Sequence, residues 1–175
     1  QDVQNDLNKS EQELQNQDKN AAKPKQKSAA KKMQQMGKQM MSAMQMGEMQ
    51  QMQEDVKLLR QILDNLLTFS FSQEDLMKDT KQTNPRSLQM NKVLKQQQDL
   101  KVQFKHIDDS LFAISLRNKD ITENVLNEVG IVHYNVDKSL ETLSQINISK
   151  GASHQQYTLT SANKLADFLS NVQQN

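Results

Sequence analysis

The chain has 175 residues, of which 35% are hydrophobic and only 4% aromatic, a low apolar content for a compact globular domain. It contains four glycines and two prolines, too few for the turns of a multi-stranded sheet. A bundle of thin amphipathic helices, each burying one apolar stripe, tolerates such a composition. The composition therefore predicts an all-α protein.

The charge is nearly balanced, with 22 basic and 21 acidic residues and a net charge of +1. Specific nucleic-acid binding is not expected, because it normally needs a broad basic surface. The absence of cysteine excludes disulfides, thiolate zinc sites and thiol catalysis. No apolar run approaches the roughly 20 residues that span a bilayer. Membrane attachment is expected only through parts outside this chain.

Residues 1–30 are dominated by Gln, Asn, Lys and Asp, with Val3, Leu7 and Leu14 as isolated apolar positions. Because these few apolar side chains can bury little surface, we expect a flexible arm that is disordered or loosely helical. Pro24 is expected to separate this arm from the remainder. Residues 31–175 are expected to form an elongated helical bundle.

A long helix is predicted over residues 29–69, and the stretch 31–56 within it holds eight of the ten methionines. The apolar residues are spaced three and four apart, with a phase shift near Gly47, which is typical of a packed helix seam. The predicted seam consists of Met33, Met36, Met40, Ala43, Met49, Met52, Val56, Leu59, Leu63 and Leu66.

The stretch after residue 67, "TFSFSQEDLMKDTKQTNPRS", is predicted to break this helix. A short helix is expected over residues 72–82, ending before Asn84-Pro85, because the residue before a proline disfavours the helical conformation. Further helices are predicted over residues 87–117, 120–147 and 153–173. Short polar turns between amphipathic helices favour an up-down antiparallel bundle of four main helices and one short one.

Gln97 is the single polar residue in an otherwise apolar seam of the helix over 87–117. A buried polar side chain at such a position often fixes the register or the oligomeric state of a bundle. The alternative is that Gln97 lies at the exposed edge of the seam.

Four blocks of the sequence form a set: "LLRQILDNLLTFSFSQEDLM" at 58–77, "DDSLFAISLR" at 108–117, "NEVGIVHYNVDKSLETL" at 127–143 and "QQYTLTSANKLADFLSNV" at 155–172. This set resembles the C-terminal helical region of large envelope proteins of Bacteroidota that carry domain of unknown function 4175. Those proteins are similar in having a Gln/Met-rich tract before such a block.

The resemblance implies a fragment of a larger, membrane-anchored envelope protein. It implies a location in the cell envelope, on the periplasmic side of the inner membrane. It suggests no established enzymatic activity and gives no catalytic residues to carry over to this chain.

The methionine tract has three interpretations. Core packing is favoured, because unbranched methionine fills irregular cores and many of these methionines fall on the predicted seam. Copper binding is the second, because soft thioethers spaced three apart suit Cu(I), with Met41, Met44, Met46 and Met49 as candidate ligands. The third is an adaptable surface that binds a protein partner, a second copy or an unfolded client in a chaperone-like manner, with Met41, Met44 and Met46 as the candidates.

The other chemistry-bearing residues form no recognisable catalytic or metal motif. His106, Asp108 and Asp109 are expected at the rim of a helix, and His133 with Asp137 supplies only two possible ligands at helical spacing. No nucleophile elbow or phosphate loop occurs. The sequence therefore predicts a non-enzymatic helical scaffold or protein-interaction module, with a protein partner or self-association and with no cofactor, catalytic residue or small-molecule substrate.

Overall fold

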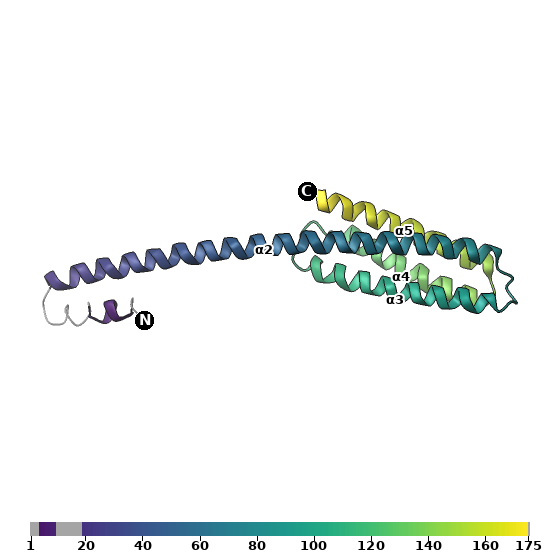
Figure 1. The fold of residues 1–175 in the computed structure, drawn as a ribbon, viewed down its shortest axis with the longest axis horizontal. Coiled ribbons are helices and arrows are strands. Elements are labelled where there is room, and N and C mark those ends of the chain that lie inside the picture. The colour runs from purple at the N-terminus through teal and green to yellow at the C-terminus, as the bar shows by residue number, and fades with distance from the viewer. Residues whose placement is uncertain (1–3, 10–18, 175) are drawn as a thin grey trace. The chain divides into compact units, whose positions relative to one another are not determined.

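A computed structural model describes residues 4–9 and 19–174 and confirms the all-α helical bundle (Figure 1). Side chains are described for residues 4–9 and 26–173. The main helices are α2 (Lys19–Gln82), α3 (Gln89–Ser115), α4 (Glu123–Ser144) and α5 (Ile148–Gln174). Much of the predicted arm, residues 1–3 and 10–18, lies outside the described residues.

The chain divides into two compact units, Gln1–Gln53 and Glu54–Asn175. This boundary differs from the one predicted near residue 30. Helix α2 begins at Lys19, so Pro24 lies within its second turn and does not separate an arm from a helix. At this position proline removes one backbone hydrogen bond close to the helix start, which a helix of 64 residues tolerates.

In the first unit, a short helix at residues 4–9 contacts α2 through polar side chains. The Asp6 carboxylate accepts hydrogen bonds from Lys32 Nζ at 2.5 Å and from Ser28 Oγ at 3.4 Å. The hydrogen bond from Lys32 lowers the pKa of Asp6 below its ordinary value. Ala29, on the same stretch of α2, is buried.

The second unit is an up-down four-helix bundle, formed by the C-terminal part of α2 with α3, α4 and α5 (Figure 1). Each pair of neighbouring helices shares a side-chain contact: Gln73–Gln97 joins α2 to α3, Asp108–His133 joins α3 to α4, Glu128–Lys164 joins α4 to α5, and Ser70–Asn163 joins α5 to α2. Leu66, Phe69, Phe104, Leu111, Leu143 and Leu165 are among the fully buried core residues.

The predicted break after residue 67 is wrong, because α2 continues without interruption to Gln82. Its buried stripe keeps the spacing of three and four through this region: Leu59, Ile62, Leu66, Phe69, Gln73, Leu76 and Thr80. The hydroxyl groups here do not disturb the helix, since Thr68 and Thr80 donate to the carbonyl oxygens of Asp64 and Leu76. The predicted helix over residues 72–82 is therefore the last part of α2.

Helix α5 begins at Ile148, five residues before the predicted start, so the turn after α4 is shorter than expected. Backbone hydrogen bonds from Ile146 to Leu143 and from Asn147 to Thr142 form the closing pattern of a Schellman motif. Gly151, which falls in the turn expected between the helices over 120–147 and 153–173, lies inside α5 instead. A Cβ atom there would come within 2.2 Å of Leu143 Cδ2, so glycine permits the close approach of α4 and α5.

Ile146 is the left-handed residue of this motif, with φ at 60°, a conformation that a β-branched residue adopts only at a cost. Because its side chain is 53% exposed, Ile146→Gly removes strain and loses little packing. We expect this change to raise the free energy of unfolding by about 1 kcal/mol in urea denaturation. Ile146→Ala retains a Cβ in the left-handed region and should give no such gain; an equal gain from both changes would contradict the strain.

Candidate functional site

The most distinctive surface of the described residues is the methionine segment, defined as Lys31–Met52 of α2. All eight of its methionines are exposed, with exposed fractions between 51% and 70%. The other two methionines, Met77 and Met90, are buried in the bundle. The chain thus contains two populations of methionine, and only the minor one contributes to the core.

The prediction that the methionine tract packs as a core seam is wrong. Of the ten positions in the predicted seam, only Leu59 and Leu66 are buried and Leu63 is partly buried. The physical reason is length: α2 has 64 residues, whereas α3, α4 and α5 have 27, 22 and 27. Partner helices of that length bury the stripe of α2 only from Leu59 onward.

Helical geometry distributes the exposed thioethers over more than one face of α2. Met33, Met36, Met40 and Met44 follow one another at spacings of three and four, which places them on one face. Met46, Met49 and Met52 follow at spacings of three on a different face, after the phase shift near Gly47. The partner candidates Met41, Met44 and Met46 are therefore exposed but share no single face.

The bundle core contains a second feature, a buried polar layer made by Gln73, Gln97, Gln155 and Thr80. Gln73 and Gln97 exchange amide hydrogen bonds of 3.0 and 2.8 Å between α2 and α3. Gln155 Nε2, from α5, donates to Gln97 Oε1 and to Thr80 Oγ1, at 3.0 Å each. All four side chains are fully buried. Gln97 is therefore a buried polar residue of the seam and does not lie at the exposed edge.

Gln73 and Gln155 were missed as members of this layer. Gln73 occupies a regular position of the α2 stripe, four residues after Phe69, but the predicted helix break hid that periodicity. Gln155 lies in the second turn of α5, whereas the prediction placed it in the first turn of that helix, because the turn before α5 was predicted too late. Gln155 Oε1 accepts no hydrogen bond from any described residue, so one buried acceptor of the layer lacks a donor.

Loss of the Gln97 amide leaves the buried amide of Gln73 without its partner and removes one of the two hydrogen bonds that Gln155 Nε2 donates. We expect Gln97→Leu to lower the free energy of unfolding by about 1–3 kcal/mol in urea denaturation, despite its similar volume. The double variant Gln73→Leu/Gln97→Leu should recover part of that loss, since it removes both members of the reciprocal pair. Additive losses in the double-mutant cycle would show that the pair is not coupled.

The histidines of the bundle are engaged in hydrogen bonds between helices or are exposed. His133 Nε2 lies 2.8 Å from Asp108 Oδ2, and its ring makes an edge contact with Phe104. Asp137, expected as the possible partner of His133, instead pairs with Lys101 at 2.7 Å. His106 is exposed. No group of three or more His, Asp or Glu residues suited to a metal ion occurs within residues 4–9 and 19–174.

His154 of α5 binds Asn135 of α4, with Nδ1 and Oδ1 2.9 Å apart. Asn135 Nδ2 donates to the carbonyl oxygen of Ile131, which turns its Oδ1 toward the histidine. His154 Nδ1 therefore carries the hydrogen of this bond. Partial burial lowers the pKa of His154 below its ordinary value, and the nearby cations Lys138 and Lys150 lower it further.

A lowered pKa means that folded His154 holds its proton less tightly than the unfolded chain does. Its contribution to stability is therefore present above the ordinary pKa near 6.5 and is lost as the pH falls through the lower pKa of the folded state. We expect the unfolding free energy to decrease between about pH 7 and pH 5, and His154→Gln to flatten part of this slope. An unchanged slope in that variant, measured by urea denaturation at each pH, would contradict this assignment.

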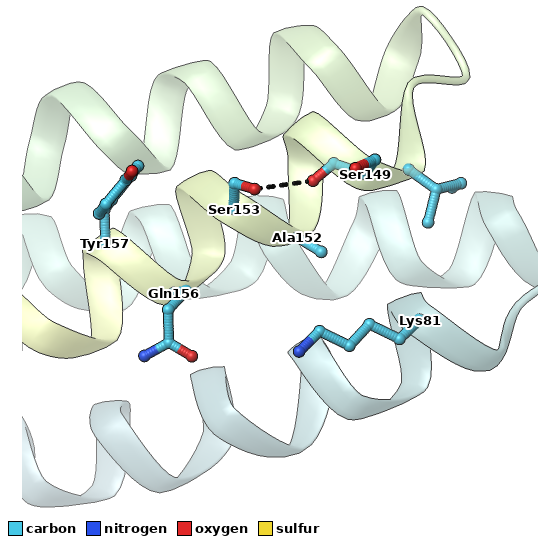
Figure 2. A pocket seen from close by; sticks show the side chains of 7 residues that line it. Lys81, Ser149, Ala152, Ser153, Gln156 and Tyr157 are labelled. Atoms are coloured by element: carbon cyan, nitrogen blue, oxygen red, sulfur yellow. Dashed lines mark hydrogen bonds between the residues drawn. The ribbon is translucent and has the colours of Figure 1, made fainter.

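A hollow of about 620 Å³ lies between the end of α2 and the first turns of α5 (Figure 2). Lys81, Ser149, Ala152, Ser153, Gln156, Tyr157 and Ile148 line it. Ser153 Oγ donates to the backbone oxygen of Ser149 at 3.0 Å. The lining contains hydroxyl groups and one ammonium group, and it includes no histidine, carboxylate or cysteine. A second groove, of about 320 Å³ between α2 and α3, carries Asp75, Asp79 and Asp99.

Comparison with known proteins assigns no relatives: no family model, curated protein or solved structure matches this chain. The resemblance to envelope proteins with domain of unknown function 4175 stays a prediction. Among the described helices, none combines the length and the apolar character needed to cross a membrane.

Proposed function

We propose that this chain is a non-enzymatic protein-interaction module whose binding element is the methionine segment of α2. The observation that carries the proposal is the exposure of all eight methionines of Lys31–Met52. Exposed apolar surface of this extent often marks a contact with another protein. The bundle of residues 54–175 serves as the folded scaffold from which α2 extends in sequence.

The chemistry of the segment fits adaptable recognition. Methionine is flexible and polarizable, so a methionine surface adjusts to partners of different shape. Glutamine separates the methionines, which keeps the helix soluble and supplies donors and acceptors at the rim of a contact. The partner chemistry is therefore an apolar protein surface, belonging either to another protein or to a second copy of this chain.

The location and the parent protein are part of the same proposal. The family resemblance supports a fragment of a larger, membrane-anchored protein of the cell envelope. Within that setting the bundle acts as a scaffold and the methionine segment as the contact.

Substitution of the central methionines separates apolar contact from helix formation. Met40, Met41 and Met44 are changed together to glutamine, which has a helix propensity close to that of methionine. Each apolar side chain that is buried in a contact contributes about 1.5–3 kcal/mol. Because ~1.4 kcal/mol of binding free energy corresponds to a tenfold change in affinity, the triple glutamine variant should weaken binding at least tenfold. The measurement is photo-crosslinking from positions 36 and 46 in the native host, paired with sedimentation equilibrium of the purified chain.

The matched control changes the same three residues to leucine, which retains apolar surface and nearly the same volume. Crosslinked products should survive in the leucine variant and disappear in the glutamine variant. Equal crosslinking in the wild-type chain, the glutamine variant and the leucine variant would contradict the proposed contact. Concentration-dependent mass in sedimentation equilibrium identifies the partner as a second copy.

A further inference from the structure

Three of the exposed thioethers form a compact group on the surface of α2. Met44 lies one turn after both Met40 and Met41, at spacings of four and three residues. Residues at these spacings are surface neighbours, with Cβ atoms roughly 5–6 Å apart. Met40 and Met41 are the only adjacent methionines of the chain, so no other position brings three methionines within one turn.

The surroundings of this group leave room for a ligand. Gly37 lies three residues before Met40, and Gly47 lies three residues after Met44. A Cβ added at either glycine would meet no atom within 4 Å. The three methionines themselves are 64–69% exposed, and each side chain has three rotatable bonds with which to orient its sulfur.

We propose that Met40, Met41 and Met44 bind a soft monovalent cation, Cu(I), through three thioether sulfurs. Soft thioether ligands select Cu(I) over the harder divalent ions. Within one turn of the group there is no histidine or cysteine, and Glu48 is the single residue of a type that binds zinc. The ion enters and leaves as Cu(I), so binding involves no change of oxidation state. The site refines the wider set Met41, Met44, Met46 and Met49, because Met46 and Met49 lie on another face.

Two charged residues border the group and should tune its affinity in opposite directions. Glu48 lies one turn after Met44, and its carboxylate brings a negative charge toward a bound cation. Lys38 lies one turn before Met41 and brings a positive charge. At separations near 6 Å in a watery environment, each charge contributes about threefold in affinity. Glu48→Gln should therefore weaken Cu(I) binding, and Lys38→Gln should strengthen it.

The test is an anaerobic titration of the full chain with Cu(I), in competition with a chromophoric Cu(I) chelator. The wild-type chain should bind one tight equivalent. The variant with Met40, Met41 and Met44 changed to leucine should lose at least about tenfold in affinity. A matched control changes Met33, Met46 and Met52, which are 52–70% exposed but are not neighbours, to leucine and should retain the tight equivalent. Equal losses in the two variants, or no tight equivalent in the wild type, would overturn the site.

A second readout follows the methyl groups of the methionines directly. In a chain labelled with ¹³C at the methionine methyl groups, one equivalent of Ag(I), a redox-inert analogue of Cu(I), should shift the signals of Met40, Met41 and Met44 first. The buried Met77 and Met90 provide internal references that should not move. Uniform shifts of all eight exposed methyl signals from the first addition would contradict a defined site.

The variants distinguish a failure of the proposed Cu(I) site from a failure of the proposed protein contact. Leucine at positions 40, 41 and 44 removes the sulfur ligands but keeps the apolar surface, so it abolishes metal binding and preserves the contact. Glutamine removes both. Circular dichroism should be unchanged in all of these variants, because methionine, leucine and glutamine have similar helix propensities.

Discussion

The bundle depends on the hydrogen-bonded glutamine layer at its centre. Apolar stripes alone tolerate sliding of one helix along another, because leucine and isoleucine contacts are similar from one turn to the next. Gln73, Gln97 and Gln155 do not tolerate it, since any shift along the axis would leave buried amides without partners. One layer thus sets the register of α2, α3 and α5 together. The contacts at the rim, such as Ser70 with Asn163 and Asp108 with His133, then form at positions that this register determines.

The same register limits how much of α2 is covered. With the layer at Gln73, the 27 residues of α3 and of α5 bury the α2 stripe from Leu59 to Thr80. The methionines of the first unit receive no such cover and remain exposed. Burial along α2 is therefore decided by the length of the other helices and by the position of one polar layer. The hydrophobicity of α2 itself does not decide it, because apolar residues three and four apart also occur in the methionine segment, for example Met33, Met36, Met40 and Met44.

This explains which features the sequence predicted well. The helices over 87–117 and 120–147 were placed within three residues of the observed ends, because their stripes and their flanking turns agree. The predicted break after residue 67 was wrong because serine and threonine are common in turns. The buried stripe through Phe69, Gln73 and Leu76 nevertheless requires a helix there. The methionine seam was wrong for a different reason. Periodicity reports that a helix has an apolar face, and only the partner helices decide whether that face is covered.

The distribution of residue types along α2 follows the same division. The covered stripe is built mainly of leucine, isoleucine and phenylalanine, whose few rotamers specify one packing arrangement. The uncovered part uses methionine, which specifies packing poorly but adapts to a partner and offers a soft ligand atom. If the segment were only an excess length of helix, lysine, glutamate and glutamine would keep it helical without exposing apolar surface. Eight exposed thioethers within 20 residues, beside a core that contains only two methionines, therefore support the proposed binding role and not packing within this chain.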